Sequence, residues 1–197
     1  MAKLYYQGHG SFRLTTAAGT VIYVDPFAGA GYDLPADFIL VSHEHYDHNA
    51  IELVRQKADC KIYRSADLLV DGVYKTVSLG EVTVQAVPAY NKNHDRASCV
   101  GFLLEIDGVK LYAAGDTSKT DYMEENLSKM ALDYALLPMD GIYNMPPKEA
   151  EVCAGIIGAK HTIPIHMKPG ALFDRAMADA FQCAGKLVLE PGEEIDL

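Results

Sequence analysis

The chain has 197 residues, and its content of 49% hydrophobic and 22% charged residues is typical of a soluble globular protein. Its formal net charge of -10 and the lack of any run of Lys and Arg argue against a nucleic acid as partner. Because no window of about 18 consecutive apolar residues exists, we expect no membrane span.

The length is that of one domain, and no linker or low-complexity segment interrupts it, so we expect residues 1–197 to form a single domain. The N-terminal residues lack the apolar core of a signal peptide, which favours a cytoplasmic protein. Its cysteines form no C-x-x-C pair and are interpreted as small buried side chains: Cys60, Cys99, Cys153 and Cys183.

Short apolar runs separated by turn residues predict strands, and longer patterned runs predict helices. Asp107-Gly108 is a strong hairpin signal between two of these strands. The pattern of hairpins interrupted by single helices, in two similar halves, predicts two packed sheets with helices outside. The expected strands are 4–6, 11–14, 20–24, 37–41, 61–63, 73–77, 81–87, 100–106, 109–113, 134–137, 162–165 and 186–189, and the expected helices are 50–55, 66–69, 123–130, 148–157 and 173–183.

One stretch, 42–49, is unusually rich in metal-binding side chains and follows the buried strand 37–41 directly. Imidazole nitrogen and carboxylate oxygen are the donors that cations such as zinc prefer. His43 and His45, two residues apart on an extended chain, point to the same side and can reach one metal. Asp47 and His48 lie further along and are better placed for a second ion. The alternative is a polar loop that is rich in His by chance.

Three more candidate ligands stand where later predicted strands end, which is where open sheets usually place their chemistry. They are His94, Asp116 and His166. With the motif, five of the seven histidines are used in this way.

The H-x-H-x-D-H pattern, with these later residues in the same order, resembles the metallo-β-lactamase-fold hydrolases. The resemblance covers nearly the whole chain. It implies an α/β protein with an αββα four-layer sandwich and two divalent metal ions, of which zinc is the first choice and Mn or Fe are alternatives. The ligands that it implies are His43, His45 and His94 for the first ion, Asp47, His48 and His166 for the second, and Asp116 as the bridge.

Within that family the chain is similar to small L-ascorbate 6-phosphate lactonases and N-acyl phosphatidylethanolamine phospholipase D-like proteins. Segments that carry this similarity include 87–91, 100–102, 114–117, 136–138 and 163–166. The chain departs from the pattern after His94, where the segment is short and Ser98-Cys99 replaces an aromatic residue.

Three other side chains have two readings each. His9, between two glycines, is interpreted as a turn residue or as a neighbour of the site that is not itself a ligand. His161 is expected to be a surface or packing residue. Asp25 either hydrogen-bonds a ligand imidazole and fixes its tautomer or only caps the strand before Pro26.

Two metal ions would lower the pKa of a water between them to about 7, and the hydroxide would attack a small ester, lactone or phosphoester. Asp116 is then expected to position both ions, and Asp47 to orient the hydroxide or accept its proton. Tyr143 could donate a hydrogen bond to a leaving group or an oxyanion, and Lys168 or Arg96 could hold an anionic substrate. These three roles rest on loop position alone, and the alternative for each is a solvated loop residue.

The sequence leaves other functions open. The same ligands could hold a single iron in an oxygenase, another redox enzyme could use this fold, or the chain could be a metal-binding module without catalysis. Neither G-x-S-x-G nor a P-loop is present to support a serine hydrolase or a nucleotide triphosphatase. The expected partner is a small-molecule substrate, and a homo-oligomer remains open.

Overall fold

The computed structural model describes residues 1–197 and contains two six-stranded sheets. In the first sheet, the strands from the N-terminal half pair antiparallel at first and parallel where the chain approaches the His-rich motif. In spatial order, the strands of this sheet are β14 (Glu194–Asp196), β1 (Lys3–Gly8), β2 (Ser11–Thr15), β3 (Val21–Val24), β4 (Ala36–Val41) and β5 (Gln56–Arg64).

The second sheet is built from the later part of the chain and repeats this mixed plan. Asp107 and Gly108 turn the chain between two of its strands with positive φ angles of 49° and 84°, so the predicted hairpin is confirmed. In spatial order, its strands are β13 (His161–Ile165), β12 (Tyr134–Pro138), β11 (Val109–Ala113), β10 (Val100–Ile106), β9 (Val82–Pro88) and β8 (Thr76–Leu79).

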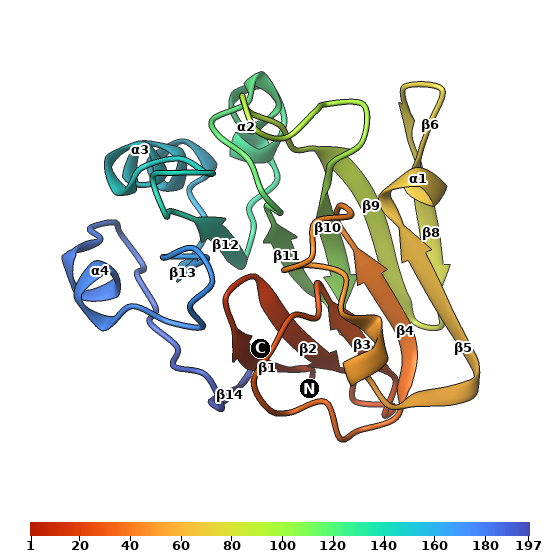
Figure 1. Ribbon diagram of the computed structural model, residues 1–197. Helices are drawn as coiled ribbons and strands as arrows, with labels where there is room; N and C mark the ends of the chain where they lie inside the picture. The colour runs from red at the N-terminus through yellow and green to blue at the C-terminus, as the bar shows by residue number, and fades with distance from the viewer.

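The helices are short and lie mainly over the outer face of the second sheet. Figure 1 shows α2, α3 and α4 on the side of β12 and β13, away from β4 and β5. No helix combines the length and the apolar character that crossing a membrane requires. The helices are η1 (Ile51–Leu53), α1 (Ser65–Leu68), α2 (Asp121–Glu125), η2 (Leu127–Lys129), α3 (Pro147–Ile157) and α4 (Arg175–Ala180), and a small hairpin of β6 (Leu69–Val70) and β7 (Val73–Tyr74) follows α1.

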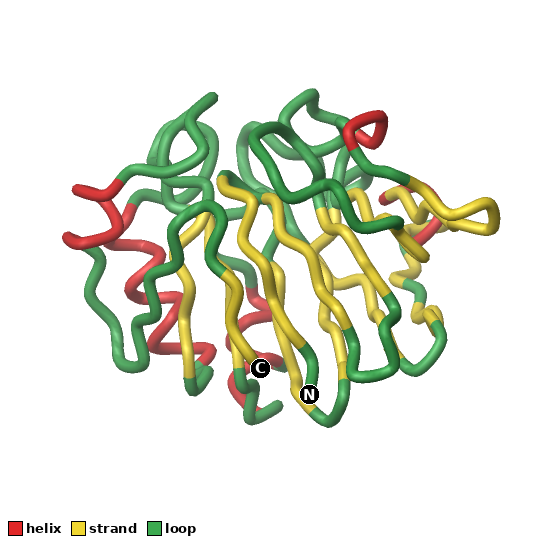
Figure 2. Tube along the Cα trace, turned by 90° about the horizontal axis from the view of Figure 1, so that it is seen from below, coloured by secondary structure: helices red, strands yellow, loops and turns green.

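The main core lies between the two sheets, because alternate side chains of each strand point inward. A second apolar cluster joins the outer face of the second sheet to α2 and α3, and a smaller one covers the outer face of the first sheet. That smaller cluster is closed by Tyr32 and Val54, from a loop and the segment after η1, so no α-helix forms the outer layer there. The termini lie close together because β1 pairs with β14, as Figures 1 and 2 show.

The predicted helix over 50–55 is wrong, because only the single turn η1 forms there. The backbone N–H and carbonyl of Arg55 form hydrogen bonds with segments that are distant in the sequence. Its N–H donates to Tyr32 O at 3.3 Å, and its carbonyl accepts from Ala36 N at 2.8 Å. These bonds direct the chain into β5 one residue later.

The predicted strand over 186–189 is also wrong. Thr162 and Lys186 form one isolated bridge, with Thr162 N donating to Gly185 O and Leu187 N donating to Thr162 O, both at 2.9 Å. The next bond of a parallel ladder would need an amide proton on residue 164, which is a proline. The pairing therefore stops after one bridge.

Candidate metal centre

The predicted site residues gather at one edge of the sandwich, where strands of both sheets end. The 43–48 motif follows β4, His94 follows β9, Asp116 follows β11, and His166 follows β13 directly. The structure therefore brings together side chains from four loops that are far apart in the sequence.

His43, His45 and His94 form the first group, with ligand atoms within 4.8 Å of one another. Nδ1 of His43 lies 3.0 Å from the hydroxyl of Ser42, and that hydroxyl donates its own proton to Asp25 Oδ2 at 2.6 Å. The Ser42 oxygen can therefore only accept from Nδ1–H. A neutral His43 ring then carries its lone pair on Nε2, the atom that faces the site.

His94 is held in the same tautomer by a different partner. Its Nδ1 lies 3.0 Å from Oδ1 of Asn91, an oxygen that accepts the proton. The same oxygen accepts from the backbone N–H of His94 at 3.1 Å. Nε2 of His94 is therefore also left with a lone pair in the neutral ring.

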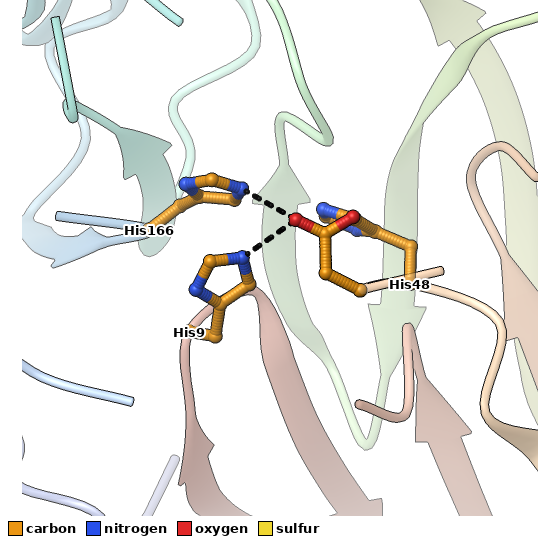
Figure 3. A group of neighbouring side chains, drawn as sticks. His9, His48 and His166 are labelled. Atoms are coloured by element: carbon orange, nitrogen blue, oxygen red, sulfur yellow. Dashed lines mark hydrogen bonds and ion pairs between the residues drawn. The ribbon is translucent and has the colours of Figure 1, made fainter. Parts of the chain in front are cut away.

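Asp47, His48 and His166 form the second group, and His9 joins them, with ligand atoms again within 4.8 Å. Oδ2 of Asp47 lies 3.2 Å from Nε2 of His9 and 3.7 Å from Nε2 of His166. Figure 3 marks both contacts with dashed lines and shows the three labelled histidines converging on one carboxylate.

Carboxylates behind the second group hold its imidazoles in place. Nδ1 of His48 lies 2.9 Å from Oδ2 of Asp25, and Nδ1 of His166 lies 2.9 Å from Oδ2 of Asp140. Asp25 therefore contacts a candidate ligand imidazole, which is the first of its two predicted readings. Each contact leaves Nε2 directed at the centre.

Asp116 lies between the two groups. Its carboxylate is 3.2 Å from Nε2 of His94, in the first group, and 3.3 Å and 3.4 Å from Nε2 of His48 and His166, in the second. The side chain is almost fully buried. One carboxylate therefore reaches both groups, as the predicted bridge requires.

The donors at this centre match the needs of a metal ion. The buried Nε2 atoms of His43, His48 and His166, and Nδ1 of His166, make no hydrogen bond of good geometry despite the nearby carboxylates, which is unusual for buried polar atoms. A divalent cation would satisfy the Nε2 atoms and the neighbouring carboxylates together.

Comparisons with known proteins identify the family of this chain. The family model described as "Beta-lactamase superfamily domain" matches residues 3–166. The chain belongs to the metallo-β-lactamase superfamily. A "UPF0173 metal-dependent hydrolase" of Thermococcus onnurineus is 31% identical over all of both chains, and one of Methanoregula boonei is 32% identical over 98% of this chain and 97% of its own.

The chain is thus a member of the UPF0173 metal-dependent hydrolase family, and the predicted family resemblance and α/β fold class are confirmed. A solved metallo hydrolase, Igni18 from Ignicoccus hospitalis, superposes with a TM-score of 0.80 over 98% of this chain and 97% of its own. At 23% identity, that likeness supports the shared fold alone.

Charge is strongly polarised in the centre. Burial lowers the pKa of His43 to about 2, so this ring is neutral. Burial also opposes charge on His166, but the carboxylates, Asp116 first, raise its pKa to about 9. They raise the pKa of His48 well above its usual value against the same burial. Despite its own burial, Asp116 keeps a pKa well below the usual range beside these rings.

The backbone at this edge is strained. His9, Asp25 and His166 have positive φ angles of 57°, 46° and 44°, a conformation that few residues other than glycine adopt. Hydrogen bonds hold it: His166 N donates to His9 O at 2.9 Å, and Asp25 N donates to Leu40 O at 2.9 Å. Such strain persists where the surroundings fix side chains for a function.

A cavity of about 530 Å³ opens over the centre, and Tyr143 lies at its rim with 51% of its surface exposed. Hydrogen bonds from two neighbouring segments hold the loop that carries Tyr143. Asp140 Oδ1 accepts from the backbone N–H of residues 142, 143 and 144, and the Tyr143 carbonyl accepts from the side-chain amides of Asn91 and Asn93, both at 2.9 Å. Asn91 and Asp140 also contact His94 and His166, so this loop is connected to both groups.

Neither of the two cationic candidates lines this cavity. Lys168 is exposed and directly precedes Pro169, which does line it. Arg96 stacks over the ring of Tyr90, with its guanidinium carbon 5.0 Å from the ring centroid, and lines another cavity together with Asp95 and Ala97. His161 is exposed and stacks on Tyr134, as a surface or packing histidine should.

Sequence reasoning missed Asp140, Ser42 and Asn91 as partners of the candidate ligands. Asp140 lies two residues after the end of β12, and polar residues at strand ends are candidates for a functional site. The same criterion that selected the candidate ligands therefore also selects Asp140. Nothing in the sequence separates Asn91 from the neighbouring loop asparagine, Asn93. Of the two interpretations of His9, a turn residue or a neighbour of the site, the structure supports the second, because its Nε2 lies 3.2 Å from Oδ2 of Asp47.

Proposed function

We propose that this chain is a hydrolase that uses two divalent metal ions. His43, His45 and His94 would hold the first ion, Asp47, His48 and His166 the second, and Asp116 both. The observation that carries this proposal is the position of Asp116, within 3.4 Å of histidine nitrogens from both groups. Membership of a family named for metal-dependent hydrolysis supports it.

Zinc suits this centre, because imidazole nitrogen and carboxylate oxygen are among its usual donors. Mn and Fe accept the same donors and remain alternatives. Such ions, when bound, make a water acidic enough to supply a nucleophile and polarise a carbonyl or phosphoryl oxygen. No Ser or Cys nucleophile is then needed.

Side chains of the protein would carry out the proton transfers. Asp47 is half-buried, and its Oδ2 faces the centre, where it can accept a proton from the attacking water. Against the cost of its burial, the contacts with His166 and His9 keep its pKa low, so it is ionised. Tyr143, at the cavity rim, can donate its phenolic proton to the leaving oxygen. The substrate class is a small ester, lactone or phosphoester.

Removal and return of metal tests this proposal. Chelated protein is expected to lose hydrolysis of para-nitrophenyl esters and to regain it when Zn or Mn is added back. The substitution Asp59→Ala, at an exposed carboxylate on β5, is a control that should respond as the wild type does. Activity that survives chelation would contradict the proposal, and dependence on a single iron with O₂ consumption would favour an oxygenase.

A further inference from the structure

A second cavity adjoins the one over the metal centre and shares part of its lining. Glu44, His45 and His94 line both, and the second measures about 520 Å³ against about 530 Å³ for the first. Both are within the usual size range of small-molecule sites. A group held at His45 and His94 therefore has room to extend in two directions.

The first cavity offers aromatic surface. Tyr46 and Tyr143 line it together with Pro169, and Tyr46 is 73% exposed. Tyr46 follows a strand of the first sheet and Tyr143 a strand of the second, so the two rings come from different halves of the fold. Exposed rings at a cavity rim favour contact with an apolar or aromatic group.

Most of the wall of the second cavity consists of small side chains, some polar and some apolar. Ser65, Ala66, Ala97 and Ser98 are short side chains, and Leu69 adds an apolar surface. Such walls suit a slim aliphatic or weakly polar substituent.

Carboxylates line both cavities, and no Lys or Arg lines either. Glu44 belongs to both, and Asp95 to the second. Arg64, the nearest partner of Glu44, holds this carboxylate at 2.7 Å and lines neither cavity. The Arg64 guanidinium offsets the charge of Glu44, but an anionic group away from the metals would find no Lys or Arg in either lining to pair with.

We propose that the substrate is an uncharged open-chain carboxylic ester with one substituent on each side of its scissile bond. The alcohol part, apolar or aromatic, lies in the first cavity, and the acyl part lies in the second. The inference rests on the proposed hydrolase function. Water adds OH to the acyl carbon and H to the alcohol oxygen as the C–O bond breaks, so the reaction needs no further reactant.

The first test compares substrates with the metal-loaded protein. We expect para-nitrophenyl butanoate to have a higher kcat/KM than either of two charged phosphate esters. Bis(para-nitrophenyl) phosphate has a substituent on each side of the scissile bond, and para-nitrophenyl phosphate has a substituent on one side only. A phosphate ester with equal or higher kcat/KM would overturn the inference while leaving the hydrolase proposal standing.

The second test fills the second cavity. Ala97→Trp and, independently, Ala66→Trp place an indole at exposed positions of its wall. The KM for para-nitrophenyl butanoate should rise about tenfold. The KM for para-nitrophenyl acetate, whose acyl part is shorter, should change by less than about twofold. Ala18→Trp, in the exposed turn after β2, is the matched control and should change neither. An equal change in KM for both esters, or no change for either, would overturn the assignment of the acyl part to the second cavity.

A binding readout separates the two proposals. The chain has no Trp, so the introduced indole is the only one and its emission reports on this cavity. Benzyl propyl ketone, which replaces the ester oxygen of phenyl butanoate with a methylene group, should change the emission of Ala97→Trp saturably and not that of Ala18→Trp. Binding without any ester hydrolysis would contradict the hydrolase proposal alone, whereas no saturable change would overturn this inference.

Discussion

Asp25 Oδ2 lies 2.9 Å from Nδ1 of His48, so a carboxylate at the end of β3 fixes an imidazole that the motif after β4 supplies. The same carboxylate also accepts hydrogen bonds from the backbone N–H and the hydroxyl of Ser42, at 2.7 Å and 2.6 Å. Ser42 in turn fixes His43. One buried side chain therefore orients a histidine of each proposed metal ion.

This position makes Asp25→Ala a sharp test of the metal centre. We expect a loss of roughly 10–100-fold in metal affinity, because the partners of ligating imidazoles typically contribute that much. Asp25→Asn should lose less, since its amide oxygen can still accept from His48. Competition with a chromophoric chelator measures the affinity. An unchanged affinity in Asp25→Ala would rule out this orienting role.

The loop that carries Tyr143 allows a matched pair of substitutions. Asn91 contacts both His94 and the Tyr143 carbonyl, whereas the Asn93 side chain donates to the carbonyls of Tyr143 and Ile142 and makes no hydrogen bond to a candidate ligand. We expect Asn93→Ala to raise KM with metal content unchanged, and Asn91→Ala to lower metal affinity as well. Kinetics and elemental analysis of the two variants separate these effects. Equal metal loss in both would contradict the assignment of Asn91.

Tyr143→Phe tests proton donation to the leaving group. The ring remains at the rim, so binding should persist, while kcat should fall by about a hundredfold or more if the phenol acts as an acid. The fall should be smaller for esters whose alcohol is a good leaving group. Tyr46→Phe, at the other exposed tyrosine of the cavity, should leave kcat within about twofold of the wild type. Identical kcat values for the Tyr143→Phe variant and the wild type on all esters would remove Tyr143 from the mechanism.

Metal binding should release protons. In the metal-free protein, the carboxylates hold the pKa of His48 well above its usual value and that of His166 at about 9, against the opposing effect of burial. Both rings are therefore protonated at neutral pH and must become neutral to bind a cation. Metal affinity should rise as pH increases from 7 toward about 9. Calorimetric titration at pH 7, in buffers with different ionisation enthalpies, would show this release as a buffer-dependent heat, and a constant heat would contradict it.

The same shifts give the metal-free protein a characteristic pH dependence. A raised folded-state pKa stabilises the fold below the unfolded value of 6.5, and this stabilisation is lost as pH rises through about 9. The unfolding midpoint of the chelated protein should therefore fall over that range.

Much of this centre could be predicted from the sequence because metal ligands are recognisable residue types at strand ends. His43, His94, Asp116 and His166 all follow predicted strands, and the structure brings them together. Their assignment as ligands stays a prediction. The orienting residues Ser42 and Asn91 were not predictable in the same way, because Ser and Asn are common in loops and only the folded geometry gives them a partner.

The errors in the predicted elements have a related cause. The 50–55 and 186–189 segments have the local patterns of a helix and a strand, but hydrogen bonds to distant segments decided their conformations. Arg55 bonds to Tyr32 and Ala36, and Pro164 cannot donate to a neighbouring strand. Local propensity is a weak guide where tertiary bonds compete with it.

The central claim is that two ions share Asp116, and metal stoichiometry tests it most directly. Elemental mass spectrometry of the purified protein should find about two Zn or Mn ions per chain. His94→Ala, which removes a proposed ligand of the first ion alone, should reduce this to about one. Asp116→Ala, which removes the shared ligand, should weaken both. One ion per chain in the wild type, or stoichiometry that neither substitution changes, would contradict the account.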